Sequence, residues 1–196
     1  MDVKQNILSQ FEQNKGFLIV GAMHTAAELY QLEKMLKSNE VQRIKRGVYI
    51  LLDHQSFNER VLIAKMYPDA VFCLYSIWAI YGLTTSMPLT HCIAMGRHTK
   101  VTIPDYPPLQ VYYWSDASYQ LGITEMSIDG QRIKIYDLEK SVCDAIKHRG
   151  KIGENITLEV LKSYIQLQHK DLNKLMQYAK QLRIDSITAQ YIKPLL

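Results

Sequence analysis

The chain has 196 residues, of which 47% are hydrophobic and 21% are charged, and its formal net charge is +4. This length and apolar content are enough for one large domain or two small ones, and they exclude a disordered chain. The basic balance is compatible with nucleic acid but does not assign a partner by itself.

The N-terminal third begins with residues that favour helices. Ile7, Leu8 and Phe11 recur at helical spacing within Val3–Asn14, which predicts a first helix. After a brief apolar segment at residues 17–20, Gly21–His24 can form a short second helix.

A third helix is predicted from Thr25 to about Lys37. Thr25-Ala-Ala-Glu28 is a capping box, in which the threonine hydroxyl accepts from the third backbone N–H and the glutamate reaches back. One apolar stripe follows at Leu29, Leu32, Met35 and Leu36. Asn39 can end the helix in the left-handed conformation.

The segment Val41–Leu52, VQRIKRGVYILL, predicts a short hairpin with a basic edge. Val41, Ile44, Val48 and Ile50 can face a core, whereas Arg43, Lys45 and Arg46 are expected outside. Gly47 supplies a permissive backbone at the turn. Helix, short helix, capped helix and hairpin in about fifty residues is the element order of a winged helix-turn-helix.

The rest of the chain is predicted to be mixed. A polar linker at residues 53–58 separates the two parts. Beyond it we expect a helix at 59–66, an apolar run at 70–74, a helix at 77–81 capped by Ser76 and closed by Gly82, strands at 91–95, 109–114, 124–128 and 131–136, and helices at 138–148, 157–168, 170–182 and 186–192. Asp129-Gly130 is a strong hairpin turn, and Gly150 and Gly153 are expected to break the first of the final helices.

The predicted fold class is therefore α+β. A winged helix-turn-helix at residues 1–55 precedes a mixed α/β domain at 56–196, which has a small sheet and a C-terminal helical part. Residues 70–96 contain no charged side chain, but this stretch is too interrupted for a membrane span. The N-terminus lacks the pattern of a signal peptide.

The cysteines at 73, 92 and 143 are widely spaced and form neither a CxxC motif nor a Cys/His cluster. We interpret them as buried small hydrophobic residues of a cytoplasmic protein, and no metal or cofactor is expected.

Three stretches resemble the AbiEi family of antitoxins from bacterial type IV toxin–antitoxin (abortive infection) systems. They are LEKMLKSNEVQRIKRGVYIL, the element from Ser76 to Tyr81-Gly82-Leu83, and YDLEKSVCD ending at Asp144. Their order and spacing are more specific than any one of them. Asn39 and Val41 depart from the family, where glycine and leucine are commoner.

The resemblance implies a DNA-binding autorepressor without enzymatic activity. Its winged helix would bind inverted repeats in the promoter of its own operon. Its C-terminal domain would counteract a toxin with a nucleotidyltransferase-like fold, without a stable toxin–antitoxin complex. An alternative is a stand-alone winged-helix transcription factor whose C-terminal domain senses a ligand or dimerises.

Two sets of side chains are the candidates for DNA contact. On the hairpin, Arg43, Lys45 and Arg46 would contact phosphates or enter the minor groove, although such charges also protect an edge strand from aggregation. On the capped helix, the candidates are Thr25, Tyr30, Gln31, Lys34 and Lys37. Glutamine can read adenine and lysine can reach guanine, but an ordinary solvated face has the same composition.

Other clusters have competing interpretations. Tyr112, Tyr113 and Trp114 could stack RNA bases, although aromatic strand residues more often belong to a core. Asp137, Glu139 and Asp144 could hold a metal as in nucleases, which would make the chain an enzyme. The more conservative interpretation makes Asp137 a helix cap and pairs Asp144 with a basic side chain. Basic residues of the C-terminal helices are interpreted mainly as a solvated surface.

Overall fold

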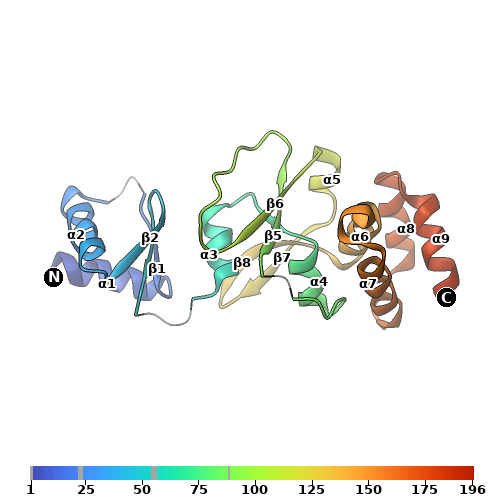
Figure 1. The fold of residues 1–196 in the computed structure, drawn as a ribbon, viewed down its shortest axis with the longest axis horizontal. Helices are drawn as coiled ribbons and strands as arrows, with labels where there is room; N and C mark the ends of the chain where they lie inside the picture. The colour runs from blue at the N-terminus through green and yellow to red at the C-terminus, as the bar shows by residue number, and fades with distance from the viewer. Residues whose placement is uncertain (1, 22–23, 54–56, 88) are drawn as a thin grey trace. The chain divides into compact units, whose positions relative to one another are not determined.

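We analysed a computed structural model that describes residues 2–21, 24–53, 57–87 and 89–196. The chain divides into two compact units, residues 1–68 with 102–107 and residues 69–101 with 108–196 (Figure 1). Helices and two small sheets make up the described residues, which confirms the predicted α+β class. The predicted domain boundary after residue 55 stays a prediction.

The first unit contains two helices and a small sheet, followed by a third helix. Its elements are α1 (Val3–Gln13), β1 (Phe17–Ile19), α2 (Ala26–Lys37), β2 (Val41–Lys45), β3 (Val48–Leu51) and α3 (Glu59–Met66). The sheet is antiparallel in the order β1-β3-β2, so the two partners of the central strand come from opposite sides of α2 in the sequence.

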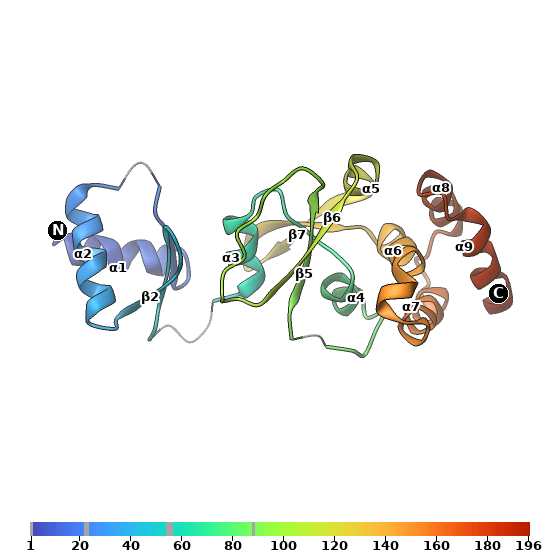
Figure 2. The same cartoon turned by 45° about the horizontal axis from the view of Figure 1, so that its top comes forward.

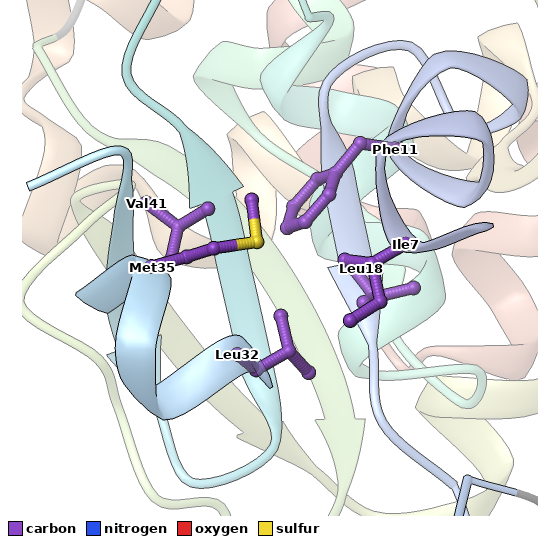
Figure 3. Packing of buried hydrophobic residues seen from close by; sticks show 6 residues of the cluster. All are labelled: Ile7, Phe11, Leu18, Leu32, Met35 and Val41. Atoms are coloured by element: carbon purple, nitrogen blue, oxygen red, sulfur yellow. The ribbon is translucent and has the colours of Figure 1, made fainter. Parts of the chain in front are cut away.

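One hydrophobic cluster joins α1, α2 and the sheet. Its fully buried members are Ile7, Phe11, Leu18, Leu32, Met35 and Val41. Figure 3 shows these side chains pointing toward one another from α1, β1, α2 and β2. Because each element contributes one apolar stripe, removal of these side chains from water holds both helices against the sheet.

The local signals of this unit are largely confirmed. Thr25 and Glu28 form the complete capping box of α2. Asn39 has a φ of 56° and Gly47 a φ of 78°, so both take the left-handed conformation at their turns. The stripe prediction was wrong at Leu29, which is 41% exposed because it lies at the edge of the apolar face.

The predicted short helix at Gly21–His24 lies partly outside the described residues. Gly21 and His24 are described and are not helical, although the His24 N–H donates to the Gly21 carbonyl at 3.3 Å. The centre of the predicted linker, residues 54–56, also lies outside the described residues.

The second unit is a five-stranded sheet with helices beside it (Figure 2). Its elements are β4 (Val71–Phe72), α4 (Tyr75–Tyr81), β5 (His91–Gly96), β6 (Leu109–Trp114), α5 (Asp116–Gln120), β7 (Ile123–Ile128), β8 (Gln131–Tyr136), α6 (Leu138–Ile152), α7 (Glu154–Gln166), α8 (Leu172–Gln181) and α9 (Asp185–Ile192), with a final 3₁₀ turn at Lys193–Leu195. The strand order is β6-β5-β4-β8-β7, which leaves β6 and β7 at the edges. The pairs β4–β8 and β5–β6 are parallel.

Helix α6 is the centre of this unit. It contacts α4, α7, α8 and α9, and the run from Leu138 to Ile146 is buried throughout. In both views the helices α6 to α9 gather on one side of the sheet. The polar residues within this run therefore have to find partners inside the protein.

Two sequence expectations in this unit were wrong, and one helix was missed. Ser76 does not cap α4: it lies inside the helix, and its Oγ accepts the Cys92 N–H of β5 at 2.7 Å. Gly150 does not break α6, because the helix continues to Ile152 and ends at Gly153. The short helix α5 was not predicted, since its five residues carry no clear periodicity.

The described residues contain no helix with the length and apolar character needed to cross a membrane. Cys73, Cys92 and Cys143 are free thiols and are all buried, which confirms their interpretation as small core residues.

Candidate functional site

The outward face of α2 brings together three of the predicted contact residues. Tyr30, Lys34 and Lys37 follow at four- and three-residue spacing, so they share one face of the helix. All three are exposed, and Tyr30 is 70% exposed. Leu32 and Met35 anchor the opposite face in the core. The outward face of α2 thus presents a phenol and two ammonium groups to solvent, while the opposite face is held in the core.

The other two helix candidates lie differently. Thr25 is exposed, but its hydroxyl accepts the Glu28 N–H at 3.2 Å and donates to the Glu28 carboxylate at 3.0 Å. Gln31 is half-buried on the flank of the helix rather than on its outward face. Thr25 is therefore committed to capping, and Gln31 has less freedom to reach a ligand than the sequence suggested.

Glu28 is a hydrogen-bonded carboxylate at the start of α2 that keeps its negative charge. Its carboxylate accepts the Thr25 N–H at 2.8 Å and the side-chain amides of Asn6 at 3.0 Å and Gln10 at 3.2 Å. Hydrogen bonds from Thr25 lower the pKa of this carboxyl group. The same contacts tie the start of α2 to α1.

The hairpin holds two exposed cations. Arg43 on β2 and Arg46 in the turn are both exposed, whereas Val41 and Val48 of the same hairpin are buried. The pairing register shifts between Arg43 and Lys45, which marks a β-bulge. A bulge re-aims the side chains around it and increases the local twist.

Lys45 does not share this exposure. It is half-buried, and its Nζ lies 4.1 Å from the centre of the Tyr67 ring within the same unit. Burial lowers the pKa of Lys45. The expectation of an outward-facing Lys45 was wrong because the cation stacks on an aromatic ring that lies 22 positions further along the chain.

The structure therefore divides the eight predicted contact residues into two groups. Five are exposed cations or a phenol without a capping role, namely Tyr30, Lys34, Lys37, Arg43 and Arg46. The remaining three, Thr25, Gln31 and Lys45, are engaged or half-buried. Glu33 is exposed beside the helix group and reduces its positive charge.

The carboxylates of the second unit have protein partners. Asp137 caps α6 by accepting the Lys140 N–H at 2.9 Å, and its other oxygen accepts the Tyr178 hydroxyl at 2.9 Å. Lys174 Nζ bridges Asp137 at 3.1 Å and Glu139 at 3.3 Å. The predicted cap is confirmed, and α8 supplies most of the partners.

Asp144 forms a buried ion pair with Lys140, one turn earlier on α6. Lys140 Nζ lies 2.7 Å from both carboxylate oxygens. The same ammonium group lies 4.3 Å from the centre of the Trp114 ring and 4.1 Å from that of Tyr136. The predicted basic partner of Asp144 is confirmed. The contact of its ammonium group with two aromatic rings could not be predicted from the sequence.

No group of three or more His, Cys, Asp or Glu side chains in the part of the chain that the structure describes could hold a metal ion. Asp137 and Asp144 direct their oxygens at protein donors, so they do not form an open pair of ligands. Their arrangement supports packing of α6 and α8.

The aromatic strand β6 is partly open. Trp114 is buried, Tyr112 is half-buried and Tyr113 is 46% exposed. The His148 ring of α6 stacks on Trp114, with ring centres 5.5 Å apart and planes at 15°. The three aromatic residues stand out in the sequence, but His148 does not, because it lies 34 positions beyond Trp114.

No protein-family model matches the sequence, and the search of curated proteins found no match.

Proposed function

We propose that residues 1–55 form a winged helix-turn-helix that binds double-stranded DNA. Helix α2 is the recognition helix and the β2–β3 hairpin is the wing. The single observation that carries this proposal is the exposure of Arg43 and Arg46 on a hairpin directly after a capped helix that exposes Lys34 and Lys37. Exposed cations on two consecutive elements support this proposal, because a winged helix contacts the DNA phosphates through both its recognition helix and its wing.

The two elements have different roles in this proposal. Arginines of the wing bind phosphate or the minor groove and therefore position the protein without reading sequence. Tyr30 and Lys34 are at the centre of the outward face of α2 and contact base edges in the major groove. Gln31 contacts the edge of the groove at most, because its side chain is half-buried.

For the whole chain, we propose an antitoxin of a type IV toxin–antitoxin system that represses its own operon and acts in the cytoplasm. The three stretches that resemble AbiEi antitoxins support this assignment. In the structure two of them are α2 with the hairpin and the buried start of α6. The second unit would counteract a nucleotidyltransferase-like toxin without a stable complex. A stand-alone repressor with a ligand-sensing or dimerising second unit is the other candidate.

A reporter assay tests the DNA proposal. We expect the intact chain to repress a reporter driven by the promoter of its own gene. The double variant Tyr30→Ala with Lys34→Ala should relieve repression, because it truncates both side chains on the outward face of α2. Lys4→Ala is a control on α1, since Lys4 is paired with Glu40 at 2.7 Å. Repression that survives the double substitution would contradict the role of α2.

The gene next to this one tests the antitoxin proposal. A neighbouring nucleotidyltransferase-like gene should arrest growth when expressed alone, and co-expression of this chain should restore growth. Failure of rescue, with promoter repression intact, would favour the stand-alone repressor.

A further inference from the structure

A cavity of about 570 Å³ lies at the edge strand β6 of the second unit. Its walls come from three elements: β6, the end of α6 and the start of α4. The side chains that matter below are Tyr75, Gln110, Tyr112, Tyr113, His148 and Lys151. The cavity is in the size range of small-molecule sites.

The lining combines aromatic rings with positive charge. Three tyrosines, the His148 imidazole and the Trp114 indole contribute rings, and Lys151 is an exposed cation at the rim. No Asp or Glu is among the lining residues that the structure describes. Such a lining favours a planar ring that carries a negative group.

Burial decides the protonation state of His148 at this cavity. Burial, and to a smaller extent the neighbouring cations Lys147, Lys140 and Lys151, lower the pKa of His148 to about 4. The imidazole is therefore neutral at physiological pH and can donate one hydrogen bond and accept another.

Position at a sheet edge makes the cavity accessible. Strand β6 pairs with β5 on one side only, and consecutive residues from Gln110 to Trp114 line the cavity. Gln110 is exposed and Tyr112 is half-buried, and the alternation of side chains along the strand puts both on the face that meets His148, so an amide and a phenol ring can reach one ligand.

We propose that this cavity binds a nucleobase with its attached phosphate, the base stacking on Tyr112, whose ring lies beside His148, and the phosphate on Lys151. Gln110 and His148 supply hydrogen bonds to the base edge. A free mononucleotide and a single-stranded RNA share this chemistry. The site is separate from α2 and the hairpin, and it does not depend on DNA binding by the first unit.

Calorimetry on the full chain tests the proposal with AMP, GMP, CMP and UMP, and with a hexameric RNA. We expect saturable binding of at least one mononucleotide. Tyr112→Ala and Lys151→Gln should each weaken it about tenfold, because each removes one part of the recognition. Tyr112→Phe keeps the ring and should retain affinity. If the RNA binds more tightly than the mononucleotides, with the same dependence on Tyr112, single-stranded RNA is the ligand; equal affinity identifies the mononucleotide.

Matched controls distinguish binding at this site from a general effect of positive charge and from loss of folding. Lys162→Gln removes an exposed lysine of α7 that is outside the cavity lining. This variant should leave nucleotide affinity unchanged. The proposal is overturned if no mononucleotide or RNA binds at millimolar concentration, or if inorganic phosphate binds as well as the nucleotides. Equal losses in Lys162→Gln and Lys151→Gln would overturn it as well.

Discussion

The ammonium group of Lys140 lies 2.7 Å from both carboxylate oxygens of Asp144, and the two side chains are 0% and 2% exposed. The ammonium group of this pair also lies 4.3 Å from the centre of the Trp114 ring and 4.1 Å from that of the Tyr136 ring. Burial of two charges costs free energy, and removing either partner would leave the other charge uncompensated in the core. The stretch YDLEKSVCD, which resembles an antitoxin signature and ends at Asp144, therefore forms part of the core of the second unit.

Removal of one partner from this pair should be strongly destabilising. Lys140→Met leaves the Asp144 carboxyl group buried without a cation, and we expect it to lower the free energy of unfolding by about 3–5 kcal/mol. Urea denaturation followed by circular dichroism measures the loss. The double variant Lys140→Met with Asp144→Leu should recover much of it, because no buried charge remains. A single variant as stable as the wild type would show that the pair contributes little.

His148 should make the stability of the second unit depend on pH. Its pKa is lowered from 6.5 to about 4 in the folded chain, chiefly by burial. As pH falls below 6.5 the unfolded state takes up a proton that the folded state does not, so stability is lost until the folded pKa is passed. Between pH 7 and pH 5 this single group should cost about 2 kcal/mol.

The measurement for His148 is urea denaturation at both pH values for the wild type and for His148→Phe. Phenylalanine keeps a ring against Trp114 but does not titrate. The variant should lose less stability than the wild type on acidification. Identical losses would show that His148 has an ordinary pKa.

Two glycines should respond to alanine in opposite directions. Gly150 lies within α6, and a Cβ there meets no atom within 4 Å. Gly150→Ala should therefore stabilise the chain by about 0.5–1 kcal/mol. Gly122 has a φ of 72°, and a Cβ there would lie 2.6 Å from Lys140 Cβ. Gly122→Ala should destabilise the chain by more than about 1 kcal/mol, because both strain and overlap arise. Thermal melting of the two variants checks both signs, and the same sign for both would refute the packing of Lys140 against Gly122.

Features set by neighbouring residues were predictable from the sequence. The Thr25 capping box, the left-handed Asn39 and the Asp129-Gly130 turn each depend on a few consecutive side chains, and all three are present. The strands at 109–114 and 131–136 also have their predicted bounds, since turn residues flank them.

Features that depend on distant partners were not predictable. Lys45 belongs to a basic hairpin, so the sequence predicts an exposed side chain. Only the contact with Tyr67 shows that its ammonium group lies over an aromatic ring. Ser76 resembles a helix cap in sequence, but the N–H that it accepts belongs to Cys92 on another strand. The cavity at β6 requires His148 and Lys151 from α6, and no local pattern joins them to the aromatic strand. Tertiary packing decides these contacts.

The salt dependence of DNA binding tests the role of the hairpin most directly. Fluorescence anisotropy of the full chain on promoter DNA should give a linear fall of log affinity with log salt. Arg43→Ala with Arg46→Ala should weaken binding and flatten that slope by about two, because two phosphate contacts are lost. Lys45→Ala should change the slope less, since its ammonium group stacks on Tyr67. An unchanged affinity and slope in the double variant would contradict the assignment of the β2–β3 hairpin as a DNA-binding wing.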